Sequence, residues 1–104
     1  MKRQEILNLV LETIHSIQKR NSKEISDISE DTVPIGQLPD FDSYTDVEFT
    51  TEIDVHIPID KNKRLCVSND GKTPLSVGQI VDQLVNIYSG QKQGEENGKE
   101  RLEN

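Results

Sequence analysis

The sequence predicts a small, mostly α domain: a bundle of three or four helices with a long first loop and an irregular crossover before the last helix. Three observations lead to this prediction. Two segments, one near the start and one near residue 80, repeat apolar residues at helical spacing. The 104 residues suffice for one domain with one modest core. Aromatic residues make up only 4% of the chain, so that core must be aliphatic.

The first predicted helix runs from about Lys2 to Gln18. Its apolar positions recur three and four residues apart and share one helical face: Ile6, Leu9, Val10, Thr13, Ile14 and Ile17. The polar residues that begin with Asn21 end this helix.

A long loop follows, from Ser22 to Asp42. It contains Pro34, Gly36 and Pro39, which are typical of turns and loops. It also carries scattered apolar side chains: Ile25, Ile28, Val33, Ile35, Leu38 and Phe41. We therefore expect the loop to pack across the core.

The segment from Ser43 to Ile59 gives two conflicting signals. Alternate residues from Val47 to Ile59 are apolar or β-branched, which favours a β-strand. Ser43, with Asp46 three residues later, instead favours a side-chain cap and the start of a helix. We interpret the segment as a helix from about Ser43 to Ile53 followed by extended chain through Pro58. The alternative is a strand from Val47 to Ile59.

The last predicted helix follows a polar stretch from Lys61 to Pro74, which is either a short strand and turn or an irregular crossover. Ser76 and Gln79 have the spacing of a capping box. The apolar stripe comprises Val77, Ile80, Val81, Leu84, Val85 and Tyr88, and Gly90 ends the helix. Residues 91–104 have no apolar face, so we predict a domain of residues 1–90 and a disordered polar tail.

Charge and cysteine content restrict the class of protein. The formal net charge is −7, and no Lys or Arg lies between Ile25 and Asp60, so we expect no nucleic-acid partner. The single cysteine, Cys66, cannot form an internal disulfide, and no uninterrupted apolar run is long enough for a membrane span. We expect a cytoplasmic monomer without membrane insertion and without a metal site.

Several short motifs resemble those of acyl and peptidyl carrier proteins, and they follow one another along the chain in the same order as in that family. The family's Asp-Ser-Leu and the Val-Glu-Leu that follows correspond to Asp42-Ser43-Tyr44 and Val47-Glu48-Phe49. Its Ile-Pro after the second helix corresponds to Ile57-Pro58, and its Thr-Val start of the last helix corresponds to Ser76-Val77. The resemblance covers about Ile6 to Tyr88. Tyr44 in place of Leu, a shorter second helix and the polar stretch in place of a third helix indicate a specialised member.

The resemblance implies that Ser43 carries a 4′-phosphopantetheine arm, which a separate phosphopantetheinyl transferase adds from coenzyme A. Acyl groups would then travel as thioesters on this arm, in a specialised lipid or secondary-metabolite pathway. Asp42 would position the serine or help to recruit the metal of the transferase. The chain itself would not be an enzyme.

The partners that the resemblance implies are acyl-loading and acyl-transferring enzymes with basic docking surfaces. An apolar group of Tyr44, Val47 and Thr51 and an acidic group of Asp46, Glu48 and Glu52 would meet them. Phe49 and Ile53 lie on the opposite side of the predicted helix and should enter the core. The alternative function is an unmodified acidic α+β interaction module, in which Ser43 is only a helix cap.

Overall fold

The computed structural model describes residues 1–21, 27–60 and 62–103, of which residues 91–103 are described as helical backbone only. It contains helices α1 (Arg3–Arg20), α2 (Pro34–Gln37), α3 (Ser43–Asp54) and α4 (Val77–Glu103). These ranges hold no β-strand, only an isolated antiparallel bridge between Val67 and Pro74. The predicted mostly α class is therefore confirmed, and the alternative strand from Val47 to Ile59 is wrong.

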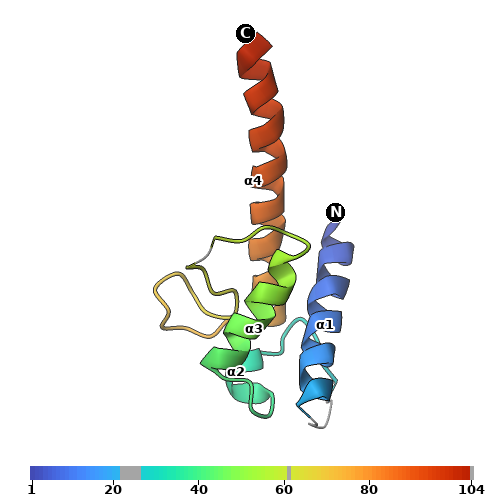
Figure 1. Ribbon diagram of the computed structural model, residues 1–104. Coiled ribbons are helices and arrows are strands. Elements are labelled where there is room, and N and C mark those ends of the chain that lie inside the picture. The colour runs from blue at the N-terminus through green and yellow to red at the C-terminus, as the bar shows by residue number, and fades with distance from the viewer. Residues whose placement is uncertain (22–26, 61, 104) are drawn as a thin grey trace.

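Helix α1 packs against both α3 and α4, so it joins the bundle together. Figure 1 shows α3 and α1 side by side, with the last part of α4 projecting beyond them. The loop between α3 and α4 lies on the outer side of α3, away from α1. No helix in the described part of the chain combines the length and apolar character needed to cross a membrane.

The core is mainly aliphatic, as the composition predicts, and draws on α1, α3, α4 and the loops between them. Its fully buried residues come from α1, α3 and α4: Ile6, Val10, Ile14, Ile17, Phe49, Ile53, Val77, Ile80, Val81 and Leu84. The loops add Leu38, Phe41, Ile57, Leu65 and Cys66, each less than a tenth exposed. Burying each large apolar side chain contributes about 1.5–3 kcal/mol, so this packing rather than helix propensity holds the bundle.

The long first loop packs across the core as expected, but it contains one short helical turn. Pro34 occupies the first turn of α2, where the missing N–H costs nothing. Ile35 and Gly36 depart from helical angles, and Gly36 has a φ of 106°. Ile25, which we expected to pack with this loop, lies outside the described residues.

The chain after α3 turns before it extends, which corrects the predicted extended segment. Val55 keeps right-handed helical angles. The N–H groups of His56 and Ile57 both donate to the Ile53 carbonyl, each at 2.9 Å. This turn brings Ile57 into the core. The crossover that follows is irregular, and its predicted first residue, Lys61, lies outside the described residues.

Helix α4 begins at the predicted capping box. The Ser76 N–H donates to Gln79 Oε1 at 2.9 Å, and the Gln79 N–H donates to Ser76 Oγ at 3.2 Å. The predicted end at Gly90 is wrong, because the helical backbone continues to Glu103. A single glycine costs a helix only about 1 kcal/mol relative to alanine, which does not by itself stop it. The boundary between a domain of residues 1–90 and a tail of residues 91–104 stays a prediction.

Candidate functional site

The loop that precedes Ser43 is held by contacts with α3 and with α1. Phe41 is buried and meets Phe49 edge to face, with 6.4 Å between the ring centroids. From α1, Gln18 Nε2 donates to the Pro39 carbonyl at 3.1 Å, and Gln18 is itself almost fully buried. Ser43 is therefore held at the surface by a loop that is anchored in the core.

Asp42, and not Ser43, is the N-cap of α3. Asp42 Oδ1 accepts hydrogen bonds from the N–H groups of Tyr44 at 3.0 Å and Thr45 at 3.1 Å. These bonds, chiefly the one from Thr45, hold the pKa of the Asp42 carboxyl below its ordinary value. The sequence prediction that Ser43 caps the helix is wrong, because Ser43 is already the first helical residue.

The Ser43 hydroxyl is exposed, and none of the described residues forms a hydrogen bond with it. A serine hydroxyl is a weak nucleophile until a neighbouring base takes its proton. The described part of the chain supplies no base in contact with Ser43. The hydroxyl is accessible from solvent.

The outer face of α3 continues from Ser43 as a stripe of exposed residues. Tyr44 is 85% exposed and Val47 is 47% exposed, and Thr51 is exposed one turn further on. The structure therefore places the predicted apolar group together on the surface. It also adds Val55, which is 79% exposed. Val55 was not predicted in this stripe, because the sequence pattern indicates extended chain at that position.

Two of the three predicted docking acids are already paired within the chain. Arg20 at the end of α1 donates to Glu48 Oε2 at 2.6 Å and also to Glu52 Oε2. The hydrogen bond to Glu52 is the main cause of a raised pKa for the Arg20 guanidinium. One positive charge from α1 thus offsets part of the negative charge of these two acids, which corrects the expectation of a freely acidic face.

The third acid, Asp46, is fully buried, so its predicted place on the docking surface is wrong. Asp46 Oδ1 accepts from the Cys66 N–H and from Thr50 Oγ1, both at 3.2 Å. Thr50 Oγ1 in turn accepts from the Leu65 N–H at 3.2 Å. Asp46 therefore ties the crossover loop to α3.

Cys66 is fully buried, as a small apolar residue would be. Burial first, and then the charge of the nearby Asp46 carboxyl, raise the pKa of its thiol far above the ordinary value. A thiol in such a place is a poor nucleophile. Cys66 is a core residue of the crossover and not a reactive group.

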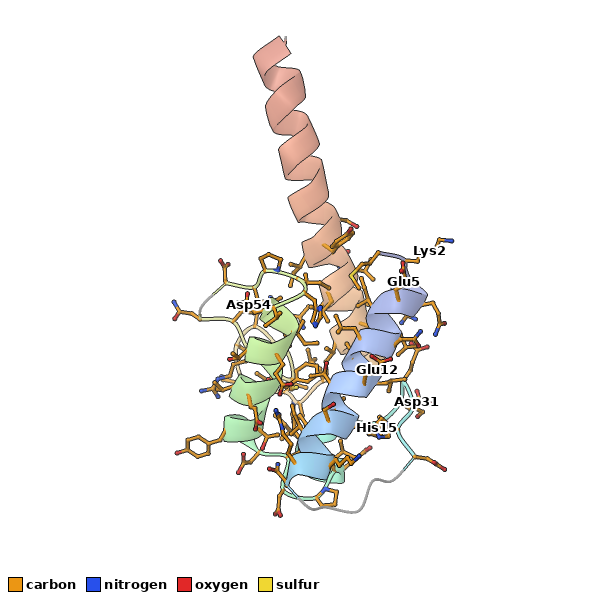
Figure 2. All side chains as sticks on the ribbon, turned by 45° about the vertical axis from the view of Figure 1, so that its right-hand side comes forward. Lys2, Glu5, Glu12, His15, Asp31 and Asp54 are labelled. Atoms are coloured by element: carbon orange, nitrogen blue, oxygen red, sulfur yellow. The ribbon has the colours of Figure 1, made fainter. Side chains whose placement is uncertain are left out.

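The two histidines belong to other segments than the first turn of α3, where Ser43 lies. His15 is half-buried on α1, and His56 is exposed after α3. Figure 2 labels His15 on α1, on the right-hand side of the molecule, and Asp54, the last residue of α3, on the left. Within the described ranges, no three His, Cys, Asp or Glu side chains are grouped in a way that could hold a metal ion.

Comparison of the chain with protein-family models, with curated proteins and with solved structures gives no match. The function is therefore inferred from the site itself. Its features are an exposed serine at the start of a helix, an aspartate cap directly before it and an exposed apolar stripe directly after it.

Proposed function

We propose that this chain is a specialised acyl carrier protein, which holds acyl groups as thioesters on a 4′-phosphopantetheine arm attached to Ser43. The observation that carries the proposal is the exposed, unbonded hydroxyl of Ser43 in the first turn of α3, directly after Asp42. The mostly helical bundle and the order of the motifs along the chain also support it.

The residues at this position suit the attachment chemistry. Ser43 Oγ would bond to the phosphorus that bears the pantetheine arm of coenzyme A. The bond from that phosphorus to the bridging oxygen would break, and adenosine 3′,5′-bisphosphate would leave with the electron pair. A base of the transferase would take the hydroxyl proton, because the described residues offer none in contact with Ser43. The arm, once attached, supplies a thiol that holds acyl groups as thioesters.

One carboxylate oxygen of Asp42 is not used in capping α3 and could serve a second role. The hydrogen bonds from Tyr44 and Thr45 all go to its Oδ1. Asp42 Oδ2 would therefore be the atom that contacts the magnesium ion of the transferase, since carboxylate oxygens are preferred ligands of magnesium. The same capping leaves little of the N-terminal partial charge of α3 for the phosphodiester, so we assign the anchoring of the arm to the covalent bond.

The exposed stripe of Tyr44, Val47, Thr51 and Val55 would be the docking face for the transferase and for acyl-handling enzymes. Exposed aromatic and aliphatic groups beside a modified residue suit the apolar centre of a partner interface. Basic groups of a partner would have to compete with Arg20 for Glu48 and Glu52. Docking would therefore depend more on Tyr44 and Val47 than on the acids.

The experiment that tests this proposal is the intact mass after incubation with coenzyme A, magnesium and several phosphopantetheinyl transferases of broad specificity. The proposal predicts one added arm on the native chain and none on Ser43→Ala. The matched control is Ser16→Ala, which alters a different exposed serine, one that lies on α1. This variant should gain the arm as the native chain does. A folded native chain that gains no mass with any transferase contradicts the proposal.

A second candidate is an unmodified interaction module that uses the same α3 face. The observation that favours it is Tyr44, which is 85% exposed although it is one of few aromatic residues in the chain. This candidate is now a helical module, because the strand on which its α+β form depended is absent from the described ranges. It predicts partner binding that Ser43→Ala leaves unchanged and Tyr44→Ala weakens.

A further inference from the structure

A pocket of about 260 Å³ lies between the outer face of α3 and the crossover loop. Figure 1 shows this loop beside α3, on the side away from α1. One wall consists of the α3 residues Val47, Thr50 and Thr51, and the other consists of the crossover residues Asn62, Lys63 and Arg64. The pocket was not apparent from the sequence, because its two walls come from segments separated by a turn.

The charge of this pocket is positive. None of its described lining residues is acidic. Arg64 is exposed and forms no ion pair with any described residue. Lys63 Nζ donates to the neutral amide oxygen Asn69 Oδ1 at 3.1 Å. By contrast, Arg3 and Arg20 each bind two carboxylates.

The remaining polar groups of the pocket are mostly engaged elsewhere. The Thr51 hydroxyl donates to the Val47 carbonyl at 2.8 Å. The Thr50 hydroxyl donates to Asp46 and accepts from the Leu65 N–H. The groups left to hold a ligand are therefore the Asn62 amide and the two cationic side chains.

Acidic groups also lie near this pocket. Asp54 lines a depression that shares Thr50 and Thr51 with it, and Asp54 Oδ1 accepts from the Ile59 N–H at 2.6 Å. Asp60 and Asp70 line a larger neighbouring depression that shares Asn62, Lys63 and Arg64 with the pocket. Asp70 accepts hydrogen bonds from the Ser68 hydroxyl and the Lys72 N–H, and neither acid forms an ion pair with Lys63 or Arg64 within the described structure. Among the described residues, Lys63 and Arg64 thus have no carboxylate partner.

The helical register connects this pocket to Ser43. Val47 lies one turn after Ser43, and Thr51 lies one turn after Val47, so the three residues share one face of α3. At 1.5 Å per residue, Thr51 is about 12 Å from Ser43 along the helix axis. A group attached to Ser43 therefore starts on the face that leads into the pocket.

We propose that this pocket receives the free carboxylate of an acyl group carried on Ser43, so that the cargo is the half-thioester of a dicarboxylic acid. The proposal rests on the proposed carrier function. A carboxylate gains charge-assisted hydrogen bonds from Arg64 and Lys63, and Arg binds carboxylates in a fork geometry. An alkyl end gains nothing from these groups. The pocket is open at the surface, so the interaction weakens as salt is added.

The test compares two loaded forms of the full chain by amide NMR. A broad-specificity transferase adds the arm from butyryl-coenzyme A or from succinyl-coenzyme A, which differ in their terminal methyl and carboxylate groups. We expect the two spectra to differ at residues 47–51 and 62–64. The difference should vanish in Arg64→Gln and in Lys63→Gln, and should persist in Lys72→Gln. Lys72 is the matched control because it is an exposed cation of the same loop that does not line the pocket.

Each outcome bears on a different claim. Failure of both coenzyme A thioesters to load refutes the carrier function and this inference with it. Loading that gives identical spectra for the two cargoes overturns the inference and leaves the carrier function intact. A spectral difference between the two cargoes that Arg64→Gln and Lys63→Gln leave unchanged also overturns the inference. A spectral difference that Lys72→Gln removes to the same extent overturns it as well. Arg64 forms no hydrogen bond with a described residue, so Arg64→Gln should leave the rest of the spectrum in place.

Discussion

Replacing Asp46 with alanine removes the acceptor that holds the crossover loop against α3. The carboxylate is fully buried and accepts from the Cys66 N–H and the Thr50 hydroxyl. The Cys66 N–H has no water within reach once the residue is buried. The substitution therefore leaves a buried donor without an acceptor.

The expected loss follows from these contacts. A hydrogen bond to a charged group contributes about 1.5–3 kcal/mol, and an orphaned buried donor costs about 1–3 kcal/mol. Removing the buried charge offsets part of this loss. We expect Asp46→Ala to lower the free energy of unfolding by about 2–4 kcal/mol, a large part of the roughly 5–15 kcal/mol of a typical domain. Asp46→Asn keeps an oxygen acceptor and should lose less.

The assay is urea denaturation followed by circular dichroism. With a urea dependence of about 1–3 kcal/mol per molar, the midpoint of Asp46→Ala should fall by roughly 1–4 M. Asp31→Ala is the matched control, because Asp31 is exposed and its carboxylate forms no hydrogen bond with a described residue. Its free energy of unfolding should change by no more than about 0.5 kcal/mol. An Asp46→Ala variant as stable as the native chain refutes the assigned role of Asp46.

Three further predictions concern the cap, the first loop and the cysteine. The fold lowers the pKa of the Asp42 carboxyl from its ordinary value of 3.8. The ionised carboxylate therefore stabilises the fold above pH 3.8, and this contribution is lost as the pH falls through the lowered pKa. The difference in urea midpoint between the native chain and Asp42→Asn should shrink from about pH 5 to about pH 2, and a constant difference would refute this role. Gly36→Ala should cost about 1–3 kcal/mol, because φ is 106° and an added Cβ would touch no atom, so only backbone strain acts. Gly90→Ala is the control, because Gly90 lies in open space on α4 and alanine should stabilise that helix. Equal effects of Gly36→Ala and Gly90→Ala on the free energy of unfolding would contradict backbone strain at Gly36. A disulfide reagent should modify Cys66 slowly in the native protein and rapidly in urea, because burial raises the thiol pKa; rapid native labelling would show that the crossover opens.

Much of the helical bundle could be predicted from local sequence. The stripe of α1 and the Ser76–Gln79 capping box are short-range patterns, and both have the expected structure. The strand-like alternation within the α3 segment is explained by which of its residues are buried. Phe49, Ile53 and Ile57 are four residues apart and enter the core, whereas Val47 and Val55, from the same alternating pattern, face solvent. An alternating pattern thus contains two helical faces, and the core accepts only one of them.

The contacts that local sequence could not predict join segments far apart in the chain. Asp46 is buried because the Cys66 N–H, 20 residues later, needs an acceptor. Arg20 meets Glu48 and Glu52 from 28 and 32 residues away. No local pattern distinguishes an acid that will be buried or paired from one that will stay in water. The exposure of Ser43 was predictable because the turn before it and the helix after it are both local features.

The most direct test of the carrier function is to map the modification in the chain co-expressed with a phosphopantetheinyl transferase. Trypsin cleaves after Lys and Arg, so residues 24–61 form one peptide, which contains Ser26, Ser29 and Ser43. Fragmentation of this peptide by mass spectrometry distinguishes the three serines. The account predicts a single phosphopantetheine on Ser43. An unmodified peptide from folded protein, or an arm on Ser26 or Ser29, would contradict it.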